Sequence, residues 1–516
     1  MSAANPPAAV PLATDPPDPR RWLILGVIAL AQLMVVLDAT IVNIALPSAQ
    51  RALGFTNVDR QWVVTAYALA FGSLLLLGGR VSSLLGRKVT FIGGLIGFAA
   101  ASALGGAATS FGMLVGARAL QGAFGAFMAP SALSLLTTTF GGSKDRGRAF
   151  GIFGAIAGAG GALGLLLVGV LTEYLSWRWC LYVNLIFAAV AVTGAAILLR
   201  RHPRTHRPKL DVPGALFVSS GMFCIVFGFS NAATHGWHAP ATWGFLLAGL
   251  LLLAIFAWWE TRAAEPLLPL RIVLDRNRGG AYLSILIAGS GLFGIFLFVT
   301  YYMQQTLSFS PVTTGLAFLP MIALVVVSSN LSNIVLMPRF GPRPIVTTGM
   351  LLAAGGMAWL TRIGVHSSYA ANVLPPLLVA GAALGMVIAP SINTGTFGIA
   401  PQDAGVASAS VNTGQQLGGS IGTSLLNTVA ASSTAAYLTA HVTPSTLVGG
   451  KPSALLTAQA LVHGYTRAFW WSVGIFALGA IVAAMLFHWG PLSRQGQAAP
   501  VAAVTPSPAE PGVVPG

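Results

Sequence analysis

An aspartate lies in a stretch of the sequence where a carboxylate is costly. Asp38 interrupts the apolar run VVLDATIVNIALP (35–47), part of a hydrophobic segment that begins at Trp22. A charged side chain at the centre of a membrane helix costs about 2.5 to 3.5 kcal/mol on insertion scales, so the group must be neutralised, paired or used. Burial disfavours the ionised form of a carboxyl group, which lets such a group bind and release a proton near neutral pH. We therefore predict that Asp38 exchanges a proton; a permanently paired, structural aspartate is the alternative.

One arginine falls equally deep in a predicted membrane helix. Arg118 lies in ARALQGAFGAF (117–127), and its guanidinium cannot be deprotonated in a protein. Its burial requires a carboxylate, backbone carbonyls or water, and Asp38 is the acid predicted at a similar depth. Gln121, one turn further on, faces the same side and is expected to help orient the pair. Bonding of Arg118 to the backbone carbonyls of neighbouring helices is the alternative.

No pattern indicates a metal site, a cofactor or an enzyme. The eight histidines fall in predicted loops or near helix ends, and the two cysteines, Cys180 and Cys224, fall in predicted spans. The glycine-rich stretch 151–170 follows no predicted strand and lacks the Lys-Ser/Thr of a phosphate-binding loop. No Ser-His-Asp set or pair of carboxylates is expected at one depth. We therefore expect no metal, no cofactor and no catalytic residue.

The elements that must position Asp38 and Arg118 are membrane helices. The 516 residues are 55% hydrophobic and 8% charged, whereas a soluble domain has about 25% charged residues. A spanning helix needs roughly 20 apolar residues, and about fourteen such segments are predicted. They lie near 22–46, 61–80, 88–108, 111–136, 149–172, 179–200, 213–232, 241–260, 280–302, 314–337, 344–361, 373–397, 404–430 and 467–489. This pattern predicts an all-α, multi-pass membrane protein.

The distribution of charge predicts the orientation of the chain. The net charge is +15, but most of the 27 Lys and Arg residues fall in alternate short loops on the side of the N-terminus. Positive residues mark the cytoplasmic side of a membrane protein, so both termini are expected in the cytoplasm, with the chain in the inner (plasma) membrane. The charge thus reflects topology in the lipid bilayer, and we expect no nucleic-acid partner.

Loop lengths divide the chain into five parts. Two groups of six spans flank a basic linker with two inserted helices, the second group carries a long polar outer loop at 431–466, and both ends are expected to be disordered and cytoplasmic. In chain order the parts are 1–20, 21–200, 201–279, 280–490 and 491–516. The stretches GRVSSLLGRKVTFIGGLI (79–96) and MPRFGPRPIVTTGML (337–351) echo each other, as the repeated halves of many secondary transporters do.

Six motifs follow one another within this fourteen-span frame. They are LDATIVNIALP (37–47), QWVVTAYALAFGSLLLLGGR (61–80), GRVSSLLGRK (79–88), ARALQGAFGAFMAPSALSLL (117–136), SWRWCLYVN (176–184) and AGVASASVNTGQQLGGSIG (404–422). Together they resemble the fourteen-helix branch of the drug:proton antiporters in the major facilitator superfamily, from Trp22 to about Trp489. The resemblance implies a major facilitator fold with two six-helix bundles plus two inserted helices.

The resemblance also implies roles for particular residues. In this family the acidic residue of the first-helix motif is tied to proton coupling, and Asp38 occupies that position. The signature loop between the second and third helices keeps Gly79, Arg80, Gly86, Arg87 and Lys88. The loop departs from the family pattern at Ser83 and Leu84, where an acidic and a basic residue are expected. Its latch on the inner face is therefore expected to be weaker or to use another partner.

The family's glycine-rich antiporter helix corresponds to residues 151–170. Gly154, Gly158 and Gly164 are among the glycines that allow close helix approach there. The family has a proline after the last of these, where this chain has Leu165. A proline-kinked hinge is therefore in doubt, whereas the glycine packing is retained.

Polar side chains scattered among aromatic ones predict an adaptable apolar substrate cavity with few fixed contacts. The candidates for its lining are Asn43, Gln121, Gln304, Gln305, Asn330, Asn412 and Gln415. Hydrogen bonding between helices is the alternative for each of them.

These observations predict a monomeric, proton-driven antiporter that exports amphipathic drugs, antibiotics or natural products by alternating access. A single deep carboxylate further predicts about one proton per cycle. Two alternatives remain at this stage. A metabolite uniporter of the same superfamily would transport without proton coupling, and a membrane sensor would not transport at all.

Overall fold

The computed structural model describes residues 19–55, 60–140, 145–200, 211–263, 266–400, 403–444, 447–448 and 451–492. The predicted lead and tail and most of the basic linker lie outside these ranges. Within them the protein is almost entirely helical, and fourteen helices have 19 residues or more. At 1.5 Å per residue each is close to or above the roughly 30 Å of a bilayer core. The predicted all-α fold with about fourteen membrane helices is confirmed.

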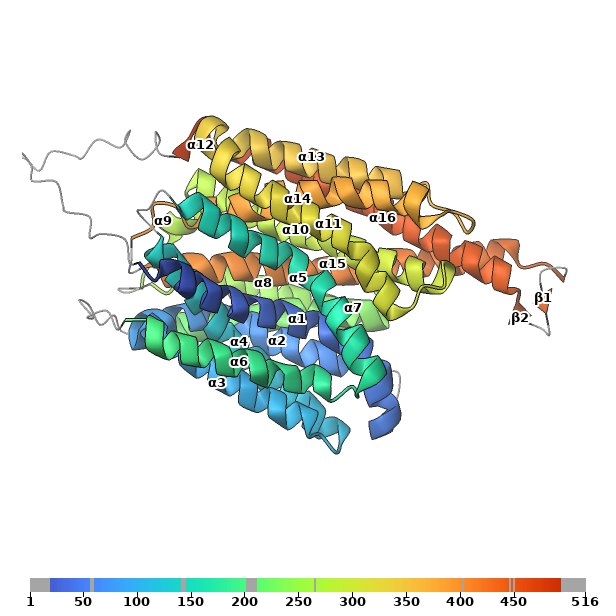
Figure 1. Ribbon diagram of the computed structural model, residues 1–516, viewed down its shortest axis with the longest axis horizontal. Coiled ribbons are helices and arrows are strands. Elements are labelled where there is room, and N and C mark those ends of the chain that lie inside the picture. Colours follow the sequence, from blue (N-terminus) through green and yellow to red (C-terminus); the bar gives the residue numbers. More distant parts are fainter. Residues whose placement is uncertain are drawn as a thin grey trace, which may run out of the picture.

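The helices form two groups of six with a pair between them in sequence (Figure 1). The N-terminal group consists of α1 (Arg21–Leu53), α2 (Arg60–Leu85), α3 (Arg87–Gly106), α4 (Phe111–Thr139), α5 (Arg146–Tyr174) and α6 (Trp179–Leu198). The inserted pair is α7 (Val212–His235) and α8 (Pro240–Glu260). The C-terminal group has the long helices α10 (Arg276–Tyr301), α11 (Pro311–Leu331), α13 (Pro342–Leu360), α14 (Leu374–Gly395), α15 (Ala404–His441) and α16 (Ala454–Leu486).

Short elements complete the C-terminal group. They are the helices α9 (Leu270–Val273) and α12 (Met337–Phe340), the π-helical turns η1 (Tyr302–Thr306), η2 (Ser332–Leu336) and η3 (Tyr369–Val373), and the strands β1 (Leu447–Val448) and β2 (Lys451–Pro452). The two strands pair antiparallel. The π-helical turns extend or precede long helices and do not interrupt the bundle.

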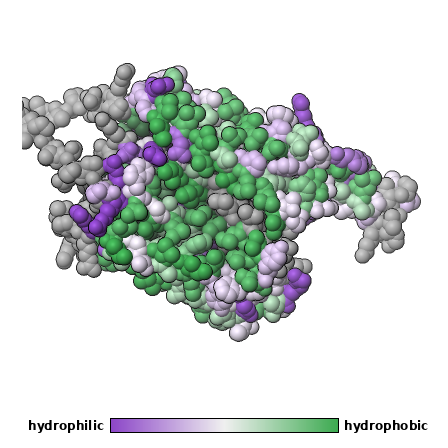
Figure 2. Space-filling model, viewed as in Figure 1, coloured by the Kyte–Doolittle hydropathy of each residue, from purple (hydrophilic) through white to green (hydrophobic). Residues whose placement is uncertain are grey.

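The surface matches a protein that lies in a bilayer. Figure 2 shows a broad apolar area across the middle of one face of the molecule and hydrophilic residues gathered toward its two ends. Eleven of the described helical segments are long and apolar enough to cross a membrane. Large apolar side chains of α8, such as Leu247, Leu250 and Trp258, are more than half exposed, where lipid would cover them.

The inserted pair touches both groups. Helix α7 packs against α8, against α2 of the N-terminal group and against α15 of the C-terminal group. One apolar cluster joins Leu76 of α2, Val218 and Met222 of α7, Phe256 of α8 and Ala409 of α15. The pair therefore lies across the junction of the two groups on one side of the molecule.

The two ends of the bundle differ. Helix α1 begins, and helix α16 ends, at the same end of the bundle, which we call the terminal end (Figure 1). We call the opposite end the loop end; α15, α16 and the two strands protrude from it. Because successive long helices alternate in direction, α5 and α15 begin at the terminal end, and α2 and α14 finish there.

The two groups approach each other closely near the terminal end, where glycines leave no room for a side chain. A Cβ atom built on Gly79 of α2 would lie 2.7 Å from the Gly405 oxygen of α15. A Cβ atom on Gly154 of α5 would lie 2.3 Å from that of Ala389 of α14. Substituents of any size at these glycines would push the two groups apart at this end.

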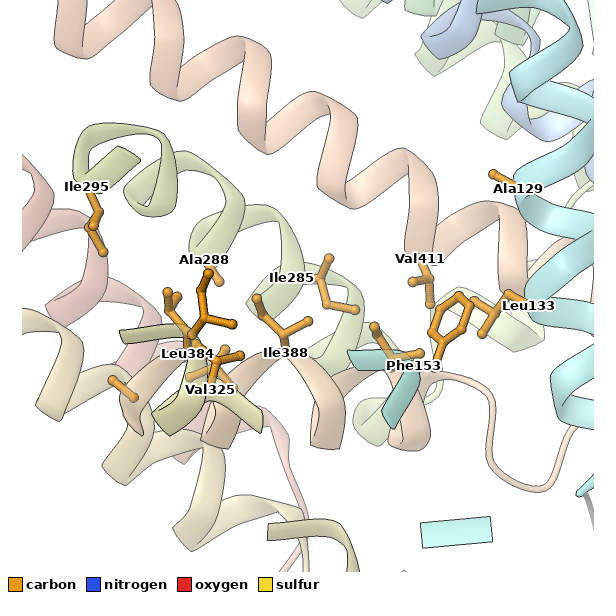
Figure 3. Packing of buried hydrophobic residues seen from close by; sticks show 14 of the residues in the cluster. Ala129, Leu133, Phe153, Ile285, Ala288, Ile295, Val325, Leu384, Ile388 and Val411 are labelled. Atoms are coloured by element: carbon orange, nitrogen blue, oxygen red, sulfur yellow. The ribbon is translucent and has the colours of Figure 1, made fainter. Parts of the chain in front are cut away.

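Apolar side chains fill the space beside these glycines. Figure 3 shows Leu133 of α4, Phe153 of α5 and Val411 of α15 side by side, with Ile388 of α14 and Ile285 of α10 next to them. All five are 5% exposed or less. In this structure the two groups are thus packed together at the level of these residues.

The predicted outer loop at 431–466 is wrong in its secondary structure. Helix α15 continues to His441 and α16 begins at Ala454, so most of the segment is helical and forms a hairpin. Alanine and leucine, which favour helix, are frequent in it, and the Ser453 hydroxyl caps α16 by accepting a hydrogen bond from the Leu456 N–H. The segment lacks a long apolar run, which is why it reads as a loop in a search for membrane spans.

Two glycines of α4 test the requirement for close packing within the N-terminal group. A Cβ atom on Gly122 would lie 2.3 Å from the backbone carbonyl oxygen of Tyr67 in α2, whereas a Cβ atom on Gly116 would meet no atom within 4 Å. We expect Gly122→Ala to lower the stability of the protein by about 1 to 3 kcal/mol through overpacking. The matched Gly116→Ala should leave it unchanged or raise it, because alanine favours helix. The midpoint of thermal unfolding of each purified variant measures this; equal midpoints would contradict the packing argument.

Candidate functional site

Asp38 of α1 lies at the centre of a polar network inside the N-terminal group. Its Oδ2 accepts a hydrogen bond from Arg118 Nη1 of α4 at 2.6 Å. Its Oδ1 accepts from Gln121 Nε2 at 3.1 Å and from Asn184 Nδ2 of α6 at 3.0 Å. Asp38, Gln121 and Asn184 are fully buried, and Arg118 is 1% exposed. The carboxylate is therefore held by one cation and two amides, away from solvent.

The guanidinium of Arg118 is satisfied from three further directions. Its Nε donates to the Val63 carbonyl of α2 at 3.2 Å, and its Nη1 also donates to Gln121 Oε1 at 2.8 Å. The ring of Tyr67 lies 4.4 Å from its central carbon, within the range of a cation–π contact. Both interpretations of Arg118 from the sequence thus occur together: it pairs with Asp38, and it also bonds to a backbone carbonyl.

Ser102 of α3 ties the two amides to each other. Its Oγ accepts from Gln121 Nε2 at 2.6 Å and from Asn184 Nδ2 at 3.4 Å. Helices α1, α2, α3, α4 and α6 therefore all contribute an atom to one buried network. Because an ionised carboxylate can only accept hydrogen bonds, this set of donors fits the charged form of Asp38.

The network can respond to a proton in a defined way. A proton on Asp38 removes the negative charge that balances Arg118 and converts one acceptor oxygen into a donor. The ion pair with Arg118 and the donor contacts of the two amides then lose much of their strength. Protonation of Asp38 would thus loosen contacts among helices of the N-terminal group.

Three side chains of the network were not predicted from the sequence. Ser102 and Tyr67 are of residue types that occur at many positions in membrane helices, so their spacing carries no signal. Asn184 does carry one, because it is an amide inside the predicted span 179–200 and closes the motif SWRWCLYVN. Buried amides in apolar helices are costly without partners, and this cost could have marked it.

The predicted cavity residues do not come together at one place. The side chain of Asn43 lies outside the described residues, and Gln121 belongs to the Asp38 network. Gln304 and Gln305 lie in η1 toward the loop end, where Gln305 Oε1 accepts a hydrogen bond from Tyr465 at 3.0 Å. Their role in a cavity stays a prediction.

The remaining three candidates lie on α11 and α15. Asn330 Nδ2 donates to the Val326 carbonyl at 2.9 Å, and Asn412 Nδ2 to the Ser408 carbonyl at 2.8 Å. Both bonds stay within one helix, four residues back, and do not join helices as the alternative interpretation expected. Gln415 is partly buried on α15.

The signature-loop residues shape the terminal end of the N-terminal group. Gly79 makes the close approach to α15, and Gly86 precedes α3 with a φ of 94°, a conformation that favours glycine. Lys88 Nζ donates to the carbonyls of Ala196 at 2.8 Å and Leu199 at 2.5 Å, and so caps the end of α6. Arg80 is buried and Arg87 is partly buried.

The glycine-rich helix α5 contains Gly154, Gly158 and Gly164, as the sequence predicts. Of these, Gly154 makes the close contact with Ala389 of α14 described above. Their proposed part in the conformational cycle stays a prediction.

A buried arginine joins the two groups at the terminal end. Arg146, the first residue of α5, donates through Nε to Asn393 Oδ1 at 2.9 Å and through Nη2 to Thr396 Oγ1 at 3.1 Å. Asn393 in turn donates to Asn333 Oδ1 at 3.0 Å. The sequence did not single out Arg146, because it reads there as one of many basic residues of the inner loops. Its 8% exposure is visible only in the fold.

The dependence of Asp38 on Arg118 can be tested by stability. Arg118→Leu leaves a buried carboxylate without its cation, and we expect a loss of about 3 to 5 kcal/mol, the usual cost of breaking a buried pair. Adding Asp38→Asn should recover part of this loss, since the unpaired charge is removed. Thermal unfolding of the purified single and double variants measures both effects.

A second pair in the chain is the control. Arg271 pairs with Asp403 at 2.7 Å, but the Arg271 side chain is 67% exposed, so Arg271→Leu should cost little. A double variant at Asp38 and Arg118 that is as unstable as Arg118→Leu alone would contradict this account of the network.

Comparison with known proteins identifies the family. The model of the Major Facilitator Superfamily matches residues 28–423. The chain is 48% identical over 484 residues to the puromycin resistance protein pur8 of Streptomyces alboniger, an alignment that covers 93% of this chain and 94% of that protein. It is 39% identical to the cephamycin export protein CmcT of Amycolatopsis lactamdurans, over 78% of this chain and 84% of the relative.

A further relative and a solved structure agree. The tetracenomycin C resistance and export protein of Streptomyces glaucescens is 36% identical over 80% of this chain and 76% of its own length. The crystal structure of the human organic anion transporter MFSD10 matches with a TM-score of 0.60, at 16% identity, over 90% of this chain and all of that one. At this identity the last match shows the fold alone. The chain belongs to the Major Facilitator Superfamily and is a multi-pass membrane transporter, not an enzyme.

Proposed function

We propose that this protein is a proton-coupled antiporter that exports amphipathic organic molecules, such as antibiotics or other natural products, across the cell membrane. The observation that carries the proposal is the ion pair of Asp38 and Arg118, buried inside the N-terminal group, with one guanidinium and two side-chain amides donating to the carboxylate. An ionisable residue inside a membrane helix is by default a functional residue. We propose a monomer as the working unit.

The direction and the class of substrate rest on the relatives. Two of them are named as export proteins for cephamycin and tetracenomycin C, and a third as a resistance protein for puromycin. These are bulky organic molecules of differing chemistry, which suits an apolar site with few fixed polar contacts. Export of such compounds from the cell is the function we transfer to this chain.

The orientation that we propose places the terminal end in the cytoplasm. The basic residues gather in the segments that connect helices at this end, among them Arg87, Lys88, Arg271 and Arg276, and positive residues favour the cytoplasmic side. The contacts of Arg146 with Asn393 and Thr396 then close the protein toward the cytoplasm. This is the arrangement that alternating access requires when the site faces outward.

The proposed transport cycle combines proton exchange at Asp38 with opening and closing of the terminal end. Substrate enters from the cytoplasm when the terminal end is open and leaves on the opposite side after the groups rock. A proton from outside then reaches Asp38 and is carried inward. One proton moving down about 100 mV releases roughly 2.3 kcal/mol, and each unit of pH gradient adds about 1.4 kcal/mol, which is sufficient for a modest gradient of substrate.

Proton coupling through Asp38 is tested in inverted membrane vesicles. With an imposed pH gradient, addition of puromycin or a lipophilic monocation should release protons with the wild type and not with Asp38→Asn, while substrate binding persists. Asp275→Asn is the matched control, because Asp275 caps α10 by accepting from the Arg278 N–H and asparagine caps equally well. Equal substrate movement by wild type and Asp38→Asn without proton flux would instead indicate a uniporter.

Substrates of different charge can test how many protons are carried in each transport cycle. Among the side chains that the structure describes, the other buried acids are Glu260 and Asp403, both at the terminal end. Glu260 accepts from the backbone N–H groups of Leu267 and Leu268, and Asp403 pairs with Arg271. With one carboxylate inside the bundle, we expect about one proton per cycle.

Export of a monocation would then be electroneutral, and export of a dication would be opposed by the membrane potential. Vesicle uptake of matched mono- and dicationic dyes measures this difference. Equal accumulation of both dyes would contradict a stoichiometry of one.

A further inference from the structure

Asn184 has a hydrogen-bonding atom that this structure leaves unused. Its Nδ2 donates to Asp38 and Ser102, but its Oδ1 is buried and has no hydrogen-bond partner among the side chains that the structure describes. Gln121, the other amide on Asp38, uses both ends, because its Oε1 accepts from Arg118 Nη1. An unsatisfied buried carbonyl is costly, so its presence beside a carboxylate points to a second arrangement in which it is used.

We propose that Asn184 is a positioning residue that follows the protonation state of Asp38. When Asp38 is ionised, the Asn184 amide nitrogen donates to it, as in this structure. When a proton binds to Asp38 Oδ1, the amide turns over and its oxygen accepts the new O–H. The only covalent change is the O–H bond on Asp38. The proposal rests on the proposed proton exchange of Asp38 and concerns how that exchange is accommodated.

Among the described side chains that contact Asp38, Asn184 is the one able to change from donor to acceptor. Gln121 cannot turn without losing Arg118, since a guanidinium offers donors only. Ser102 Oγ already accepts from both amides. Asparagine can present either a donor or an acceptor from one position, because its nitrogen and oxygen exchange places on a half-turn.

Charged and titratable groups near Asp38 are few among the described residues. Arg118 of α4 faces it, and Tyr67 of α2 lies close enough to interact electrostatically with both. Helices α3 and α6 contribute Ser102 and Asn184, which do not titrate. The described arginines of α5 lie at the terminal end. Arg146 donates a hydrogen bond to Asn393, and the guanidinium of Arg148 lies over the ring of Trp22.

The proposal predicts the direction of a titration. A hydrogen bond to a charged group is stronger than one to its neutral form, so the loss of Asn184 removes more from ionised Asp38 than from the protonated form. Asn184→Leu should therefore shift the protonation midpoint of Asp38 to higher pH. The loss of one such bond corresponds to a shift of about one pH unit or more.

Infrared difference spectroscopy of the full-length protein in lipid nanodiscs measures this midpoint. The carboxylic-acid C=O band that Asp38→Asn abolishes reports the protonation of Asp38. We expect the band of Asn184→Leu to titrate about one unit higher than that of the wild type. Asn184→Ser, whose hydroxyl can also donate or accept, should shift it less and keeps the test available if the leucine variant does not fold.

A control and a second band sharpen the test. Asn231→Leu removes an amide that donates to Thr242 within the α7–α8 pair, and the Asp38 midpoint should not move. With 13C-labelled asparagine, the amide C=O band that Asn184→Leu abolishes should shift between low and high pH, because its oxygen gains a donor only when Asp38 is protonated.

The possible failures are distinguishable. An unchanged midpoint in Asn184→Leu, or an Asn184 band that does not respond to pH, would overturn the role of Asn184 while proton exchange at Asp38 stands. Absence of any titrating band that depends on Asp38 would overturn the proposed proton coupling and this inference with it.

Discussion

A charge inside a membrane must be compensated where it lies, and much of the N-terminal group is organised around that requirement. Taking Asp38 and Arg118 out of water costs several kcal/mol for each ion, which their attraction repays only if the remaining donors and acceptors are also satisfied. Five helices contribute groups toward this condition here, with Val63, Gln121 and Asn184 among the residues that bond to the two ions. The network thus links the packing of these helices to the charge of one carboxylate.

The contact between the two groups is built on a different principle. At the terminal end the buried cation Arg146 has amide and hydroxyl partners, Asn393 and Thr396, in place of a carboxylate. Around it the helices meet through glycines, as at Gly79 and Gly154, and through interlocking apolar side chains. Neutral acceptors hold a guanidinium less strongly than a carboxylate does. Such an interface can be well packed and still separate at a modest cost.

The inserted pair α7–α8 fits into the same arrangement. It rests on α2 and α15, the two helices whose glycines meet at Gly79 and Gly405. At its terminal end the Glu260 carboxylate binds backbone N–H groups of the segment that leads into the C-terminal group. The pair is therefore attached on both sides of the junction between the two groups, and its opposite face is left to lipid.

Much of this protein could be read from the order of its residues. Runs of apolar residues predicted the helices, because a span needs a minimum length whatever it packs against. The cost of a buried charge marked Asp38 and Arg118, and the helical repeat placed Gln121 beside Arg118. Single serine and tyrosine residues are common in membrane helices, so the sequence did not indicate Ser102 or Tyr67. They belong to the network because the fold brings α2 and α3 to α1. In the sequence Arg146 is one of many basic residues in the inner loops, and only the packing of α5 against α14 places it in a buried contact. The helical hairpin at the loop end was missed because its residues favour helix without forming a long apolar run. The sequence by itself determined which groups needed a partner, since that follows from hydration; only the tertiary structure decided which partner each received, since that depends on which helices come into contact.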